Sequence, residues 1–164
     1  MENVIRIENL TKTYRKKRGV ENVSFEVGEG EIFGFIGPNG AGKSTTIRSM
    51  LRFLKFNSGK IEILGKDSVK DYEKILKEVG YMPSEALFIF DEPTSGLDPL
   101  MQNIFFELIN EYVAQGTTCM LSTHVLPEVS RYCDRAAVMR EGHLIKTDTP
   151  VNICIPFLYR EERQ

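Results

Sequence analysis

The segment from residue 37 to residue 44 has the composition and spacing of a phosphate-binding loop. It reads Gly-Pro-Asn-Gly-Ala-Gly-Lys-Ser and fits the pattern G-x-x-x-x-G-K-[ST]. Glycines let such a loop curl so that backbone N–H groups point inward at anionic oxygens, and a helix that begins near Lys43 adds the positive end of its dipole. Lys43 would bring a mobile charge to the outer phosphates, and Ser44 would offer a hydroxyl to Mg²⁺. We therefore predict that this loop holds the phosphates of a nucleotide.

A pair of carboxylates, Asp91 and Glu92, directly follows the apolar run Leu87–Phe90. A buried strand that ends in carboxylates can place Asp91 beside a metal ion and Glu92 against an attacking water. Acidic residues are also common wherever a strand meets a surface loop, so the pair alone is weak support. Combined with the phosphate-binding loop, it indicates nucleotide hydrolysis.

The elements that must position these residues alternate between strands and helices. The expected strands are Val4–Ile7, Val23–Val27, Glu31–Ile36, Lys60–Leu64, Val79–Met82, Leu87–Phe90, Thr117–Ser122, Ala136–Met139 and Leu144–Lys146. The expected helices are Lys43–Leu54, Asp71–Glu78, Asp98–Gln115 and Pro127–Tyr132. In the longest helix, the residues expected to face inward are Met101, Ile104, Phe105, Leu108, Ile109 and Tyr112. The alternation predicts an α/β fold around a mainly parallel sheet, followed by a weakly ordered tail over residues 150–164.

Length and composition predict one ordinary folded domain. The chain has 164 residues, with 21 Lys and Arg against 23 Asp and Glu, and this near balance argues against a general nucleic-acid binder. No apolar run approaches the roughly 18 residues of a membrane span, and the first residues lack the pattern of a secretory signal. Three scattered cysteines are too few for a disulfide framework, so we interpret them as reduced side chains of a cytosolic protein.

Three motifs, in this order along the chain, resemble those of the nucleotide-binding subunit of an ABC transporter. They are Gly37–Thr45 (GPNGAGKST), Asp91–Pro99 (DEPTSGLDP) and Ser122–His124 (STH). The resemblance runs over residues 7–67 and, apart from one gap, over residues 79–149. It is strongest to the ATPase partners of bacterial drug or lantibiotic-type exporters. It implies a P-loop NTPase core of the RecA-like type, with a small N-terminal antiparallel β part and one ATP-binding domain over residues 1–149.

The resemblance also implies a role for each matching residue. Tyr14 would stack on adenine, which is favoured over the alternative of an ordinary exposed loop tyrosine. Asp91, together with Ser44, would bind Mg²⁺, and Glu92 would act as the general base. His124 would contact the γ-phosphate, although a lone histidine is more often structural. The residues that would hold the phosphates of ATP are Gly37, Pro38, Asn39, Gly40, Ala41, Gly42, Lys43, Ser44 and Thr45.

Two departures from the family pattern have chemical consequences. Ser84 stands where the family has a glutamine that contacts metal and water. The family then inserts a helical subdomain with an LSGGQ-type signature, whereas this chain passes from Ser84-Glu85-Ala86 straight into Leu87. We therefore expect an internal truncation at about residues 84–87. Parallel neighbouring strands usually need a connection of about a dozen residues, so the expected pairing of Val79–Met82 beside Leu87–Phe90 is strained.

The missing subdomain leaves three functional interpretations open. The first is an ATP-binding subunit of an ABC exporter, cytoplasmic and peripheral at the inner face of the membrane, which would bind ATP and Mg²⁺ and pair with a membrane permease. Intact relatives would work as homodimers, and no nucleic-acid partner is expected. Hydrolysis would be impaired, because losing one preorganised donor typically costs about 10²–10³ in rate. The second is an ATP-binding module without turnover, and the third a non-functional remnant. A GTPase is disfavoured because no N-K-x-D occurs.

Overall fold

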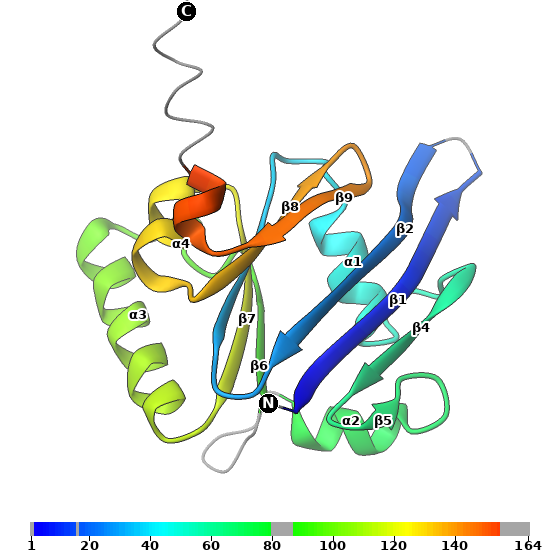
Figure 1. Cartoon of the computed structure of the whole chain (residues 1–164), viewed down its shortest axis with the longest axis horizontal. Coiled ribbons are helices and arrows are strands. Elements are labelled where there is room, and N and C mark those ends of the chain that lie inside the picture. Colours follow the sequence, from blue (N-terminus) through cyan, green and yellow to red (C-terminus); the bar gives the residue numbers. More distant parts are fainter. Residues whose placement is uncertain (1, 16, 80–86, 155–164) are drawn as a thin grey trace, which may run out of the picture.

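The computed structural model describes residues 2–15, 17–79 and 87–154, and these form two sheets (Figure 1). The antiparallel sheet has the order β2-β1-β4-β5, with bounds β1 Asn3–Tyr14, β2 Lys17–Gly28, β4 Ser58–Ile63 and β5 Lys66–Asp67. The second sheet has the order β6-β7-β3-β8-β9, with bounds β6 Leu87–Asp91, β7 Thr118–Thr123, β3 Ile32–Ile36, β8 Arg135–Arg140 and β9 His143–Asp148. All its neighbours pair in parallel except β8 and β9. The predicted α/β fold, with a mainly parallel sheet and an N-terminal antiparallel part, is confirmed.

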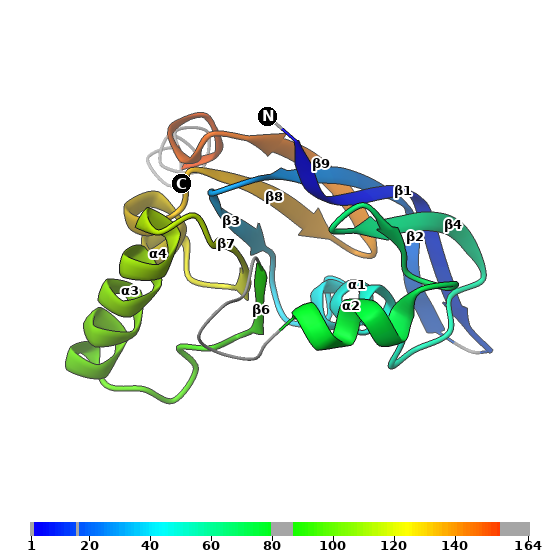
Figure 2. The same cartoon turned by 90° about the horizontal axis from the view of Figure 1, so that it is seen from below.

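Helices cover both faces of the parallel sheet (Figure 2). Their bounds are α1 Lys43–Met50, α2 Tyr72–Glu78, α3 Pro99–Ala114 and α4 Leu126–Tyr132. In β3, Phe33 and Phe35 join a core shared with α1 and the antiparallel sheet, whereas Ile32 and Ile36 point to the α3 and α4 side. This alternation follows from the two-residue period of a strand, so a fully apolar strand such as β3 can serve two cores at once. None of the helices in the described ranges has the length and apolarity needed to cross a membrane.

Asp98 and Pro99 start helix α3 as the sequence predicts, but the helix leaves part of its predicted inner face exposed. The Asp98 carboxylate accepts a hydrogen bond from Met101 N at 3.0 Å, and Pro99 occupies the first turn, which is a favourable helix start. Of the residues expected to face inward, Ile109 is buried, and Phe105 and Tyr112 are partly buried. The remaining three, Met101, Ile104 and Leu108, are exposed. The expectation that they face inward is wrong for this chain.

The outer side of β6 has little described pairing. Val79 forms an isolated parallel bridge with Leu87, the first residue of β6. Residues 80–82 of the strand predicted at Val79–Met82, like Ser84, lie outside the described residues. The described pairing on this side of β6 is therefore one bridge, whereas β7 pairs with β6 along the whole strand.

The end of the described chain is more regular than its sequence predicts. Residues 150–154 form a helical turn, with Ile153 buried against Val129. Asp148 starts this turn, because its carboxylate accepts hydrogen bonds from Thr149 N and from the Asn152 amide, both at 2.8 Å. These bonds hold the pKa of Asp148 below its usual range. The predicted tail thus cannot begin at residue 150; residues 155–164 lie outside the described range.

Two glycines with positive φ, Gly59 in β4 and Gly65 in the turn before β5, provide a matched test of the fold. Gly59 has φ of +111°, and a Cβ there would lie 2.7 Å from Leu10 Cα and 2.8 Å from Asn9 O, both backbone atoms. Gly65 has φ of +70°, and a Cβ there would have no other atom within 4 Å. We expect Gly59→Ala to lower the free energy of unfolding by about 3 kcal/mol and Gly65→Ala by about 1 kcal/mol. Urea denaturation measures both, and equal losses would contradict the close backbone approach at Gly59.

Candidate functional site

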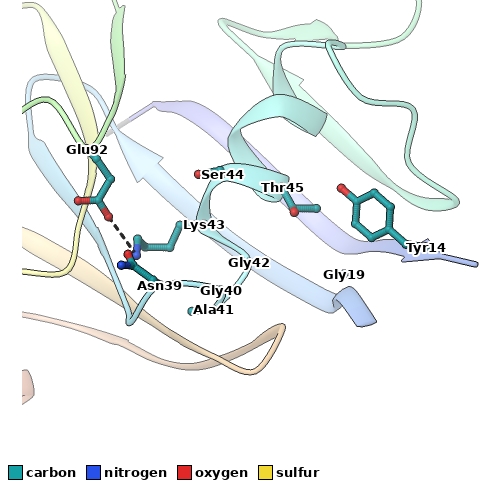
Figure 3. Close-up of a pocket in the computed structure, with 10 residues that line it drawn as sticks. All are labelled: Tyr14, Gly19, Asn39, Gly40, Ala41, Gly42, Lys43, Ser44, Thr45 and Glu92. Carbon is teal, nitrogen blue, oxygen red and sulfur yellow. Dashed lines mark ion pairs between the residues drawn. The ribbon is translucent and has the colours of Figure 1, made fainter. Parts of the chain in front are cut away.

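A cleft of about 620 Å³ lies over the start of α1, and its size suits a small-molecule ligand. Figure 3 shows its lining, with Tyr14 at one end and Glu92 at the other. The lining residues are Tyr14, Gly19, Asn39, Gly40, Ala41, Gly42, Lys43, Ser44, Thr45 and Glu92. The structure thus brings together the predicted phosphate-binding loop, the predicted adenine-stacking residue and the predicted general base.

The loop has the curled backbone that its glycines predict. Gly40 and Gly42 have φ of +81° and +105°, a region that glycine enters without steric cost. Gly42 is the N-cap of α1, so the first N–H groups of that helix are directed toward the loop. Gly37 is also required, because a Cβ there would lie 2.5 Å from Met139 O of β8. The arrangement can bind an anion with backbone donors and the helix dipole.

Lys43 is buried and already holds partners in this structure. Its Nζ donates to the carbonyl oxygens of Gly37 and Pro38 and lies 3.1 Å from Glu92 Oε1. Gly37 and Pro38 therefore contribute by holding the lysine and not by lining the cleft. A buried charge needs such partners, and an incoming phosphate can replace the carboxylate as the partner of Lys43.

Glu92 connects the loop to the STH motif. Its second carboxylate oxygen, Oε2, lies 2.8 Å from His124 Nδ1. Glu92 has φ of +52°, a costly conformation for a residue with a side chain. Its N–H is held by Ser122, which accepts through Oγ at 3.0 Å and through its carbonyl at 3.2 Å. His124 itself reaches the cleft through Glu92 and does not line it.

Asp91 is oriented by the same serine. Ser122 Oγ donates to Asp91 Oδ1 at 2.6 Å, so one hydroxyl fixes both members of the carboxylate pair. The Asp91 carboxylate and the Ser44 hydroxyl are hard oxygen donors, which Mg²⁺ prefers, and Mg²⁺ usually takes few protein ligands. The residues present therefore fit a magnesium ion bound together with phosphate.

Two contributors were not found from the sequence. Gly19 lines the cleft from β2, and a Cβ there would lie 2.0 Å from Lys12 O. Glu128 on α4 is buried and accepts hydrogen bonds from Thr94 Oγ1 at 2.6 Å and Thr123 Oγ1 at 2.7 Å. It ties the loop after Glu92 to the STH motif. For Glu128, the one signal in the sequence that could have revealed this role is an acidic residue on the inner face of a short helix.

Comparison with known proteins decides the kind of domain. Residues 20–96 match a protein family described as "ABC transporter". The uncharacterized ABC transporter ATP-binding protein MJ1023 of Methanocaldococcus jannaschii is 29% identical over 98% of this chain and 83% of its own length. These matches show an ABC transporter ATP-binding domain in this chain.

Proteins similar to this chain share its fold and contain more residues than this chain does. The solved structure of cbiO1 from Clostridium perfringens, part of the ABC transporter complex cbiONQ, superimposes with a TM-score of 0.83 at 21% identity, over 94% of this chain and 92% of that one. The bacitracin transport ATP-binding protein BcrA of Bacillus licheniformis is 26% identical over 99% of this chain and 73% of its own length.

The alignments show that these ABC relatives contain residues that this chain lacks. The MJ1023 alignment is 218 positions long, but it includes only about 161 residues of this chain, which is 98% of 164. At least about 57 positions of MJ1023 therefore have no counterpart in this chain. The BcrA alignment spans 233 residues against about 162, which leaves about 71. Both differences agree with the internal truncation expected from the sequence.

Proposed function

We propose that this chain is an ATP-binding subunit of an ABC-type exporter that binds MgATP in the cleft over α1 but hydrolyses it poorly. The observation that carries the proposal is the curled loop with Lys43 at its centre and Glu92 3.1 Å from the lysine Nζ. The ABC transporter ATP-binding domain supports ATP as the nucleotide. Relatives named for transport of an antibiotic or for resistance to one, among them the bacitracin transport protein and the linearmycin resistance protein LnrL of Bacillus subtilis, support an exporter.

Each residue takes its proposed role from its position. The backbone N–H groups of Asn39–Thr45 and the Lys43 ammonium bind the phosphates, and Tyr14, 42% exposed at the other end of the cleft, is free to stack on adenine. Ser44 and Asp91 hold Mg²⁺, which when bound neutralises charge between neighbouring phosphates. When the phosphates draw Lys43 away, Glu92 can accept a proton from water while His124 holds its other oxygen.

Poor hydrolysis follows from what the chain lacks. Phosphoryl transfer depends on positioning and on preorganised charge stabilisation, and in the family the signature of a partner subunit supplies part of both. The sequence lacks that signature, and the at least about 57 positions of MJ1023 without a counterpart here support the loss of the subdomain that would carry it. The same subdomain carries docking surface for a membrane permease in the family, so coupling to a permease at the inner face of the membrane would also be weakened. An ATP-binding module without turnover is therefore the second candidate.

Glu92→Gln tests the hydrolysis part of the proposal. We expect the phosphate-release rate to change less than about threefold, because the rate is already limited by missing donors and not by the base. MgATP binding should be retained. Phosphate release measured beside an equilibrium binding assay gives both values, and Glu107→Gln on the exposed side of α3 is the matched control. A substantial rate that depends on Glu92 would show that the chain is a competent ATPase.

A further inference from the structure

Helix α3 carries a strip of exposed apolar side chains. Leu100, Met101, Ile104 and Leu108 are between 39% and 68% exposed. They recur at spacings of three, four and seven or eight residues, which places them along one side of a helix. Single exposed apolar residues are normal, but four along one side of a helix form a continuous surface of the kind that marks an interaction site. We refer to these four residues as the α3 strip.

The strip lies on the side of α3 that faces the edge of the parallel sheet. Met101 and Leu108 share a helical row with Phe105, four and three residues away. Phe105 packs edge-on against Phe90 of β6, with 5.3 Å between ring centroids. Because β6 is the outermost of the five described strands of this sheet, the strip lies next to the row of α3 that packs on the outermost described strand.

The opposite side of α3 is already covered. Phe106 stacks on Tyr132 of α4 with 3.9 Å between ring centroids, and the Tyr132 hydroxyl donates to Asn103 Oδ1 at 3.1 Å. Figure 2 shows α4 beside one flank of α3. In the described part of the chain, α3 thus has a helical neighbour on one flank and an uncovered apolar flank on the other.

The negative charges beside the α3 strip favour a partner with positive charges. Glu107 and Glu111 are the charged residues of α3, both are exposed, and the helix carries no basic residue. Glu107 follows Ile104 by three positions and Glu111 follows Leu108 by three, so both carboxylates lie next to the strip. A second copy of this chain would place like charges together, whereas Lys or Arg would complement them.

The strip lies on the helix whose Phe105 packs against β6, the strand that directly follows the truncation expected from the sequence. The sequence predicts the truncation at about residues 84–87, before β6, and the MJ1023 alignment contains at least about 57 positions without a counterpart in this chain. We propose that the α3 strip binds an amphipathic helix supplied by another polypeptide, with an apolar face on the strip and Lys or Arg beside Glu107 and Glu111. This binding does not depend on nucleotide.

A pair of labelled synthetic peptides tests the proposal on the full chain by fluorescence anisotropy. Both have Leu along one helical face; one has Lys along the flank and the other has Glu in the same places. We expect saturable binding of the Lys peptide, at least about tenfold tighter than that of the Glu peptide, and at least about tenfold weaker in Ile104→Asn and in Leu108→Asn. Ile145→Asn replaces an isoleucine on β9 that is more exposed than Ile104 or Leu108, and it should leave the affinity unchanged. The second strip variant keeps the test valid if the first does not fold.

Four results would overturn the proposal. The Lys peptide could fail to saturate, or bind no better than the Glu peptide. It could bind the two strip variants as tightly as the unmodified chain. Analytical ultracentrifugation could instead show that the chain alone dimerises and that Leu108→Asn restores the monomer, which would assign the strip to a second copy of this chain.

Discussion

Replacing Lys43 by alanine is expected to lower the affinity for MgATP at least about 100-fold, which corresponds to about 2.7 kcal/mol. The lysine is the buried cation of the cleft, held by the Gly37 and Pro38 carbonyls and by Glu92. Its ammonium would donate charge-assisted hydrogen bonds to the outer phosphates, which are stronger than bonds between neutral groups. Without it, Glu92 would also face those phosphates with no cation between them. Isothermal titration calorimetry with MgATP measures the loss.

The control for this substitution must separate binding from folding. Lys60→Ala removes an exposed lysine whose partner is Glu62 on the antiparallel sheet, and its MgATP affinity should equal that of the unmodified chain. A thermal melt without nucleotide shows whether Lys43→Ala still folds cooperatively. Unchanged MgATP affinity in a folded Lys43→Ala sample would show that the nucleotide does not bind at this loop.

Restoring the absent stretch is expected to raise the ATPase rate at least about 100-fold, since a single preorganised donor contributes about 10²–10³. The change is insertion of the additional BcrA segment between Ser84 and Leu87, where this chain passes directly into β6. The insertion supplies the signature donors and also lengthens the connection to the dozen or more residues that parallel strands need. Phosphate release at saturating MgATP measures the gain.

Two controls show whether the gain comes from the signature. A Gly/Ser segment of the same length lengthens the connection without adding donors, and it should leave the rate unchanged. Glu92→Gln in the restored chain should remove the gain, because the base would then limit the reaction. If the Gly/Ser insertion is as active as the BcrA insertion, strain at the truncation limits hydrolysis, and the missing donors do not.

The sequence predicts the bounds of the apolar elements well, but it predicts the bounds of the paired strands β1 and β2 poorly. Strands β3 and β6 and helix α1 start within one residue of their predicted positions, because each is an apolar run or begins at a glycine-rich turn. Strands β1 and β2, however, extend well beyond Val4–Ile7 and Val23–Val27. Their additional residues are mostly polar and are held by backbone pairing and by bonds such as Asn9 N to Ser24 Oγ at 2.8 Å. Hydrophobic alternation carries no information about such pairing.

Periodicity also cannot say which neighbour covers a helix. The apolar residues of α3 are spaced for burial, yet burial of Met101 and Leu108 would need a helix that the described chain does not provide. For the site, too, the sequence reveals local motifs but not contacts between distant segments. Contiguous residues such as Gly40 and Lys43 reveal the loop by their own chemistry. Gly19 and Glu128 act through contacts with segments far away in the chain, and one sequence does not contain that information.

The central claim is that the cleft binds MgATP in a chain that lacks the donors needed to hydrolyse it. One preparation, titrated with MgATP by calorimetry and then assayed for phosphate release, tests both halves directly. The account predicts saturable binding at one site per chain and a release rate at or below about one hundredth of that of BcrA under the same conditions. Absence of binding to a folded sample, or a release rate equal to that of BcrA, would contradict it.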